Sequence, residues 1–199
     1  MSYSRTIETL IAELGKLPGI GARTAERLTF HLLKAPDEEA LALARAIHDI
    51  KTLIHPCKVC FNPTEGDLCS ICSDESRDAG VICVVEQPKD LLSIESSGAY
   101  NGRYHVLMGA IAPLDGVEAE DLTISQLVDR VQAGGVREVI LATNPTVTGD
   151  STSLYISSLL EKFPNVRITR LARGLPAGGQ IEYASKTILS DAIKDRKNL

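Results

Sequence analysis

The chain has 199 residues, of which 44% are hydrophobic and 24% are charged. This composition is typical of globular proteins and excludes a disordered or fibrous chain. With 21 basic against 26 acidic side chains and a net charge of −5, the chain is also not one that coats nucleic acid with its whole surface.

Membrane insertion and secretion are not expected. No purely apolar run is longer than Val81–Val85, whereas a membrane-spanning helix needs about 20 apolar residues. The first residues show no apolar stretch behind a basic cluster, so no secretory signal is visible. The sequence therefore predicts a soluble, cytoplasmic protein that does not contact membranes.

The first part of the chain is predicted to be helical. Apolar residues recur three and four positions apart along 7–14, the pattern of a surface helix. The stretch Leu17–Gly21 interrupts this helix, and a second helix runs through Leu33. Asp37 is expected to cap a third helix that ends near Ile54.

Beyond a short segment rich in cysteine and turn residues at 56–74, strands and helices alternate. Strands are expected at 81–85, 103–111, 139–142 and 166–171, with helices at 88–96, 124–132, 153–163 and about 183–194. Apolar strands that alternate with amphipathic helices predict a parallel sheet covered by helices. The expected fold class is therefore α/β, built from several parts.

The interruption between the first two helices has a chemical interpretation. Gly19 and Gly21 allow a tight turn and close approach to another molecule, and the N-terminus of the second helix offers amide groups to a phosphate oxygen. Arg23 and Arg27, four residues apart on one helix face, can follow a phosphate backbone. The segment resembles a helix-hairpin-helix element, which binds DNA without reading its sequence; an ordinary turn with solvated arginines is the alternative.

Four of the five cysteines form a Cys-x2-Cys-x8-Cys-x2-Cys pattern: Cys57, Cys60, Cys69 and Cys72. In a reducing compartment, two closely spaced pairs indicate a metal site rather than disulfides. Four thiolates match tetrahedral Zn²⁺ and leave no position open for water, so we expect one structural zinc ion per chain. An iron–sulfur centre is the alternative, and Cys83 is expected to be a core residue.

Polar residues follow two predicted strands at their carboxyl ends. Glu86 follows the first, and the stretch 141–150 follows a later one. This pattern resembles the Toprim module of topoisomerases, primases and some nucleases, whose clustered acids hold divalent cations for phosphoryl transfer. Glu86 matches the family's strand-end glutamate, but Asn144 and Thr146 replace its two aspartates, and Asp150 replaces its later glutamate.

This departure leaves two acids where the Toprim module has four. Because an amide and a hydroxyl supply oxygen without negative charge, we expect at most weak Mg²⁺ affinity and no catalytic site. Glu86 and Asp150 are assigned instead to an acidic face that binds a partner. A solvated strand-end carboxylate is the simpler explanation of Glu86, and a metal-dependent Toprim nuclease or strand-cleaving enzyme is the alternative function.

The charge is unevenly distributed along the chain. Residues 1–35 carry a net charge of +2, 36–73 of −3, 74–166 of −8 and 167–199 of +4. A polyanion is therefore expected to meet the basic ends, and the acidic middle is expected to meet protein or cations. The Gly-rich stretch Arg170–Gly179 is interpreted as a connection with solvated arginines, or as an interface or phosphate-facing loop; no P-loop pattern occurs.

The order of these motifs over the whole chain resembles the RecR family of bacterial recombination mediators. The resemblance implies a non-enzymatic protein that acts with RecO, and in some lineages with RecF, to help load RecA onto single-stranded DNA at the bacterial nucleoid. It implies a homotetrameric ring that binds single- and double-stranded DNA through Arg23 and Arg27, with Glu86 on a face that binds RecO. The corresponding division is a helix-hairpin-helix region at 1–55, a zinc finger at 56–73, a Toprim domain at 80–175 and a C-terminal loop and helix for oligomer contacts at 176–199.

Overall fold

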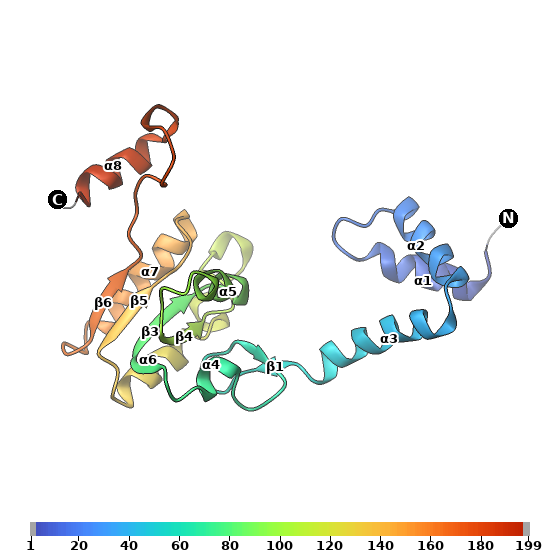
Figure 1. Ribbon diagram of the computed structural model, residues 1–199, viewed down its shortest axis with the longest axis horizontal. Helices are drawn as coiled ribbons and strands as arrows, with labels where there is room; N and C mark the ends of the chain where they lie inside the picture. The colour runs from blue at the N-terminus through green and yellow to red at the C-terminus, as the bar shows by residue number, and fades with distance from the viewer. Residues whose placement is uncertain (1–2, 197–199) are drawn as a thin grey trace. The chain divides into compact units, whose positions relative to one another are not determined.

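The structure is a computed structural model that describes residues 3–196, and its contacts separate one unit that ends at Ile54 from a second that begins at His55 (Figure 1). The first unit consists of helices α1 (Arg5–Gly15), α2 (Ala22–Lys34) and α3 (Asp37–Thr52). Ala25 and Thr29 of α2 are buried, whereas neither α1 nor α3 buries any side chain completely. The prediction that Asp37 caps the third helix is wrong by one residue, because Pro36 takes the cap position and Asp37 begins the helix.

The second unit opens with a short ladder and a short helix. Strands β1 (His55–Pro56) and β2 (Pro63–Thr64) pair antiparallel, and α4 (Ser70–Ser73) follows. The rest of the unit is a four-stranded sheet with its connecting helices. These elements are β3 (Asp78–Val85), α5 (Pro88–Ser96), β4 (Gly102–Val106), α6 (Ile124–Gln132), β5 (Glu138–Leu141), α7 (Val147–Leu160), β6 (Arg167–Arg170) and α8 (Lys186–Lys194).

The four strands are parallel and stand in the order β4-β3-β5-β6, which confirms the predicted sheet (Figure 1). Strand β3 is apolar along its central part because both faces of the sheet are covered. Ile82 and Val84 pack with α6 and α7, whereas Cys83 and Val85 pack with α5 and the four-cysteine segment. The chain leaves β3 for β4 on one side and later returns to β5 on the other, so the topological switch point lies between β3 and β5.

Several element boundaries differ from the sequence prediction, among them those of β4, α7 and α8. Strand β4 stops at Val106 rather than at residue 111, because Met108 has a positive φ of 69° that ends the extended conformation. Helix α7 begins at Val147 rather than at 153, because the Thr146 hydroxyl caps it by accepting from the N–H of Gly149 at 3.0 Å. Helix α8 begins at Lys186 rather than near 183.

None of the helices within residues 3–196 combines the length and the apolar character that crossing a bilayer requires.

Candidate functional site

Four cysteine side chains converge in the segment between β1 and α4. The sulfur atoms of Cys57, Cys60, Cys69 and Cys72 lie within 4.8 Å of one another, and all four residues are buried. Each Cys-x-x-Cys pair lies on a tight turn: Phe61 donates its N–H to the Cys57 carbonyl at 3.0 Å, and Ser73 does the same to Cys69. Tetrahedral zinc, with Zn–S bonds of about 2.3 Å, separates its sulfur ligands by about 3.8 Å. The cluster therefore has the size and the ligand type of a zinc site.

Backbone amides and neighbouring thiols set the ionisation of this cluster. Burial opposes ionisation of Cys57, but N–H groups from Cys60, Cys69 and Val59 outweigh it and lower the pKa of Cys57 to about 6. The pKa of Cys60 is raised, first by its hydrogen bond with Cys72 and then by burial. Four adjacent thiolates require a cation between them, and a divalent metal supplies that charge.

The hairpin between α1 and α2 leaves its polar groups available. Gly19 has a φ of +80°, which favours glycine, whereas Gly21 is extended and nothing lies within 4 Å of the position where its Cβ would be. Helix α2 has no side-chain cap at its N-terminus. Arg23 and Arg27 are exposed and take part in no ion pair within residues 3–196. The hairpin therefore offers two guanidinium groups and an uncapped helix N-terminus to an external anion.

Glu86 and Asn144 meet at the carboxyl ends of the neighbouring strands β3 and β5. One oxygen of Glu86 accepts the backbone N–H of Asn144 at 2.8 Å, and the other accepts its side-chain amide at 2.6 Å. Glu86 is only 9% exposed. Both carboxylate oxygens are thus engaged in holding the loop after β5, the stretch in which the resemblance to the Toprim module was found.

Gly149, in the first turn of α7, packs against this loop, and sequence reasoning gave it no role. A Cβ on Gly149 would collide with the carbonyl oxygen of Asn144 and lie 2.6 Å from Oε1 of Glu86. Its carbonyl accepts the hydroxyl of Thr143 at 2.8 Å. The position therefore requires glycine because backbone and carboxylate approach it closely. The available signal was its place three residues after Thr146, a residue type that caps helices.

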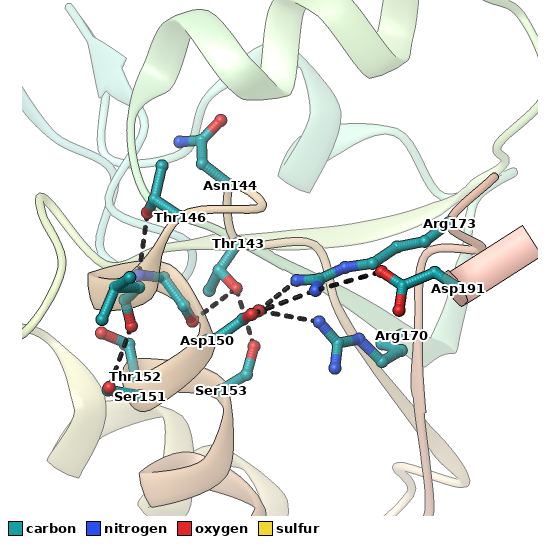
Figure 2. A network of polar contacts seen from close by, with 12 residues as sticks. Thr143, Asn144, Thr146, Asp150, Ser151, Thr152, Ser153, Arg170, Arg173 and Asp191 are labelled. Carbon is teal, nitrogen blue, oxygen red and sulfur yellow. Dashed lines mark hydrogen bonds and ion pairs between the residues drawn. The ribbon is translucent and has the colours of Figure 1, made fainter. Parts of the chain in front are cut away.

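Asp150 is paired with two arginines from the segment that follows α7 (Figure 2). Arg170 donates to Oδ1 at 2.8 Å, and Arg173 donates through both terminal nitrogens, one of them at 3.0 Å. Arg173 also lies 4.0 Å from the carboxylate of Asp191 on α8. The guanidinium of Arg173, followed by that of Arg170, holds the pKa of Asp150 below its ordinary value. Asp150 thus links α7 to the C-terminal segment, a pairing that no local spacing in the sequence indicates.

Breaking this ion-pair cluster should loosen the C-terminal segment. We expect Asp150→Asn to increase amide hydrogen exchange and protease cleavage in 171–196 and to leave exchange in β3 unchanged. Because the pKa of Asp150 is lowered, the contribution of the cluster is fully present above the ordinary carboxyl pKa and is lost as the pH falls through the lowered value. High salt should weaken it in the same way. Asp115→Asn, which removes one exposed, unpaired carboxylate, is the control, and equal exchange in both variants would contradict the assignment.

The residues at the strand ends fit Mg²⁺ poorly. Glu86 is bonded to Asn144, and Asp150 is neutralised by two arginines. In the part of the chain that the structure describes, the four cysteines are the only group of three or more acidic, histidine or cysteine side chains at metal-binding distances. Mg²⁺ needs several oxygen ligands, and the carboxyl ends of β3 and β5 do not offer such a group of free oxygens.

Comparison with known proteins identifies the helical, cysteine-rich and sheet parts of the chain. Family models match the RecR helix-hairpin-helix at residues 7–51, the RecR four-cysteine zinc finger domain at 54–74 and the Toprim domain at 80–172. A relative from Rhodopirellula baltica, described as "Recombination protein RecR", is 54% identical over 99% of this chain and 98% of its own length. Relatives of the same description from Rubrobacter xylanophilus and Desulforudis audaxviator are 53% and 51% identical, over 100% of this chain and 99% and 100% of their own lengths.

Proposed function

Because the chain belongs to the RecR family of recombination proteins, we propose that it is a DNA-binding mediator of recombinational repair. We propose that it acts with RecO to help load RecA onto single-stranded DNA at the bacterial nucleoid. RecF, which takes part in some lineages of the family, is a further candidate partner. It binds single- and double-stranded DNA without reading the sequence, and it catalyses no reaction on the DNA.

The hairpin carries this proposal. Arg23 and Arg27 are exposed, lie one helical turn apart and have no acidic partner within residues 3–196. Gly19 and Gly21 bring the backbone within reach of a phosphate, next to the uncapped N-terminus of α2. Two cations per chain bind DNA weakly and in a salt-dependent way, and several chains in one assembly raise the affinity.

The test measures DNA binding and DNA cleavage in one assay. End-labelled linear DNA is mixed with the protein in Mg²⁺ at low salt, and the gel is read for mobility and for chain length. The wild type should shift the DNA and leave it intact. Arg23→Ala with Arg27→Ala should weaken binding about 10- to 100-fold and lower the dependence of affinity on salt.

Arg45→Ala with Lys51→Ala is the matched control, because it removes the same charge from exposed positions on α3 of the same unit. Zinc content and assembly should be unchanged in both double variants. Equal affinity of the hairpin variant and the wild type would refute the DNA assignment. Cleavage that Glu86→Ala abolishes would refute the non-catalytic role and favour a Toprim nuclease.

The cysteine cluster and the acidic face complete the assignment of sites. Cys57, Cys60, Cys69 and Cys72 would hold one structural zinc ion per chain, as their distances and burial support. Glu86 and Asp150 would belong to the face that meets RecO, in a region of net charge −8. Since Glu86 is nearly buried, it would act by shaping the Asn144 loop that the partner contacts. Any Mg²⁺ binding there would be weak.

Exposed apolar residues support a homotetramer that assembles through both ends of the chain. Helices α1, α2 and α3 line an apolar groove of about 340 Å³, and Leu43, Ile47 and Ile50 of α3 are exposed. In the C-terminal part, Tyr183 and Ile193 are also exposed. We assign DNA binding to 1–55, zinc binding to 56–73, partner binding to 80–175 and oligomer contacts to 176–199.

A further inference from the structure

Arg130 is a partly buried cation. It lies in the last turn of α6, and its Nη1 donates to the backbone carbonyl of Tyr104 at 2.7 Å. Within residues 3–196, no acidic side chain lies at ion-pair distance from it. Burial lowers the pKa of Arg130, and the nearby charge of Arg103 lowers it further. A buried charge without a counter-ion is costly, so its surroundings should contain an anion.

The outer edge of β4 brings Arg130 next to the cysteine cluster. Strand β4 pairs only with β3, so alternate backbone groups of β4 point away from the sheet. Among the groups used from outside, the Tyr104 carbonyl accepts from Arg130, and the Val106 N–H donates to the Cys60 carbonyl at 2.8 Å. Because these residues are two apart on one strand, the guanidinium and the four-cysteine turn occupy adjacent positions along the same edge.

The charges of the two groups are complementary. Four thiolates around one Zn²⁺ carry a net charge of −2, which favours a cationic side chain nearby. The hydrogen bond between Val106 and Cys60 brings one Cys-x-x-Cys pair to the strand edge that Arg130 contacts. The guanidinium and the thiolates therefore compensate each other in a region from which water is largely excluded.

We propose that Arg130 is the counter-ion of the zinc–thiolate centre and that its positive charge slows the loss of zinc. It also connects α6, which packs on one face of the sheet, to the zinc segment on the other face. Arg130 is a positioning residue and not a metal ligand. The inference rests on the zinc site proposed above, and its test distinguishes the two: a wild-type protein without zinc refutes the site itself.

The experiment separates the charge of Arg130 from its hydrogen bond. Arg130→Lys keeps the charge, Arg130→Gln keeps a donor for the Tyr104 carbonyl but removes the charge, and Arg130→Met removes both. Each full-length protein is loaded with zinc, and the rate of zinc transfer to a chromogenic chelator is measured. We expect the Gln and Met variants to lose zinc about 10-fold faster or more, and the Lys variant to stay close to the wild type.

Cobalt substitution gives a second measurement that a purely structural role would not change. Without the guanidinium, the sulfur electrons are held less tightly, so the sulfur-to-cobalt charge-transfer band should move to longer wavelength in the Gln and Met variants. Arg137→Gln, which removes an exposed cation at the amino-terminal end of β5, is the control for net charge. The proposal would be overturned if Arg130→Gln lost zinc at the wild-type rate and kept the wild-type band position. It would also be overturned if Arg130→Lys or Arg137→Gln lost zinc as fast as Arg130→Gln. If the Met variant fails to fold, the comparison of Gln with Lys decides.

Discussion

Removal of zinc should unfold the segment from His55 to Asp74 and destabilise the sheet against which it packs. Structural zinc contributes about 10–16 kcal/mol of apparent binding free energy in zinc-finger peptides, and that free energy is available for folding. We therefore expect chelation, or Cys57→Ala, to abolish zinc binding and to make the segment sensitive to protease. This is the largest effect that we expect from any single change in the chain.

The reason lies in how little else holds the segment together. Its ladder, β1 with β2, contains two residues per strand, and α4 has only four residues. Of its buried residues, four are the cysteines, and Ile71 is the remaining one. A segment of this size cannot form a stable core without a staple. Because the same side chains pack with Tyr104 of β4, loss of the metal should also expose one face of the sheet.

Limited proteolysis with mass spectrometry, with and without chelator, measures this effect directly. Cys83→Ala is the matched control, because Cys83 is a buried cysteine in the same core cluster but is not one of the four that converge. It should retain one zinc ion per chain and keep the segment resistant. Equal resistance of the wild type in the presence and absence of chelator would contradict a structural metal.

Most of the architecture could be predicted from the sequence because its signals are local. The apolar run Val81–Val85 indicated a strand buried on both faces, and the structure places it in the middle of a parallel sheet. The order of hairpin, four cysteines and Toprim-like strand ends predicted the RecR family, and the family models and relatives confirm it. Each of these signals is carried by residue types and spacings within short stretches of the chain.

The side-chain contacts between distant elements could not be predicted, because their partners are far apart in the sequence. Asp150 pairs with Arg173 across 23 positions, and Arg130 reaches Tyr104 across 26. Helix α7 was expected six residues too late, because the stretch that begins at Thr146 is rich in residues that favour turns as well as helix caps. In the structure the Thr146 hydroxyl accepts from the N–H of Gly149 and caps the helix.

Gly149→Ala should destabilise the second unit by about 1–3 kcal/mol or more, as expected when a methyl group is forced into a packed site. The new Cβ would collide with the carbonyl oxygen of Asn144, which is backbone and cannot rotate away, and would lie 2.6 Å from Oε1 of Glu86. Relief requires either a shift of α7 or loss of the hydrogen bonds between Glu86 and Asn144. For a protein of this size, the midpoint of thermal unfolding should fall by about 2–4 °C per kcal/mol.

Gly174→Ala is the control in the same unit, because nothing lies within 4 Å of its Cβ position and its φ is not positive. Circular dichroism gives the unfolding midpoints, and hydrogen exchange reports on the loop that follows β5. An unchanged midpoint in Gly149→Ala would mean that the Glu86 carboxylate can leave its place easily. The Glu86 carboxylate would then be free to bind a cation, and its hydrogen bonds to Asn144 would not keep it from Mg²⁺. A large loss of stability in a variant that still binds DNA would support a structural role for Glu86. In this protein, the strand-end glutamate of the Toprim module would then hold the loop after β5.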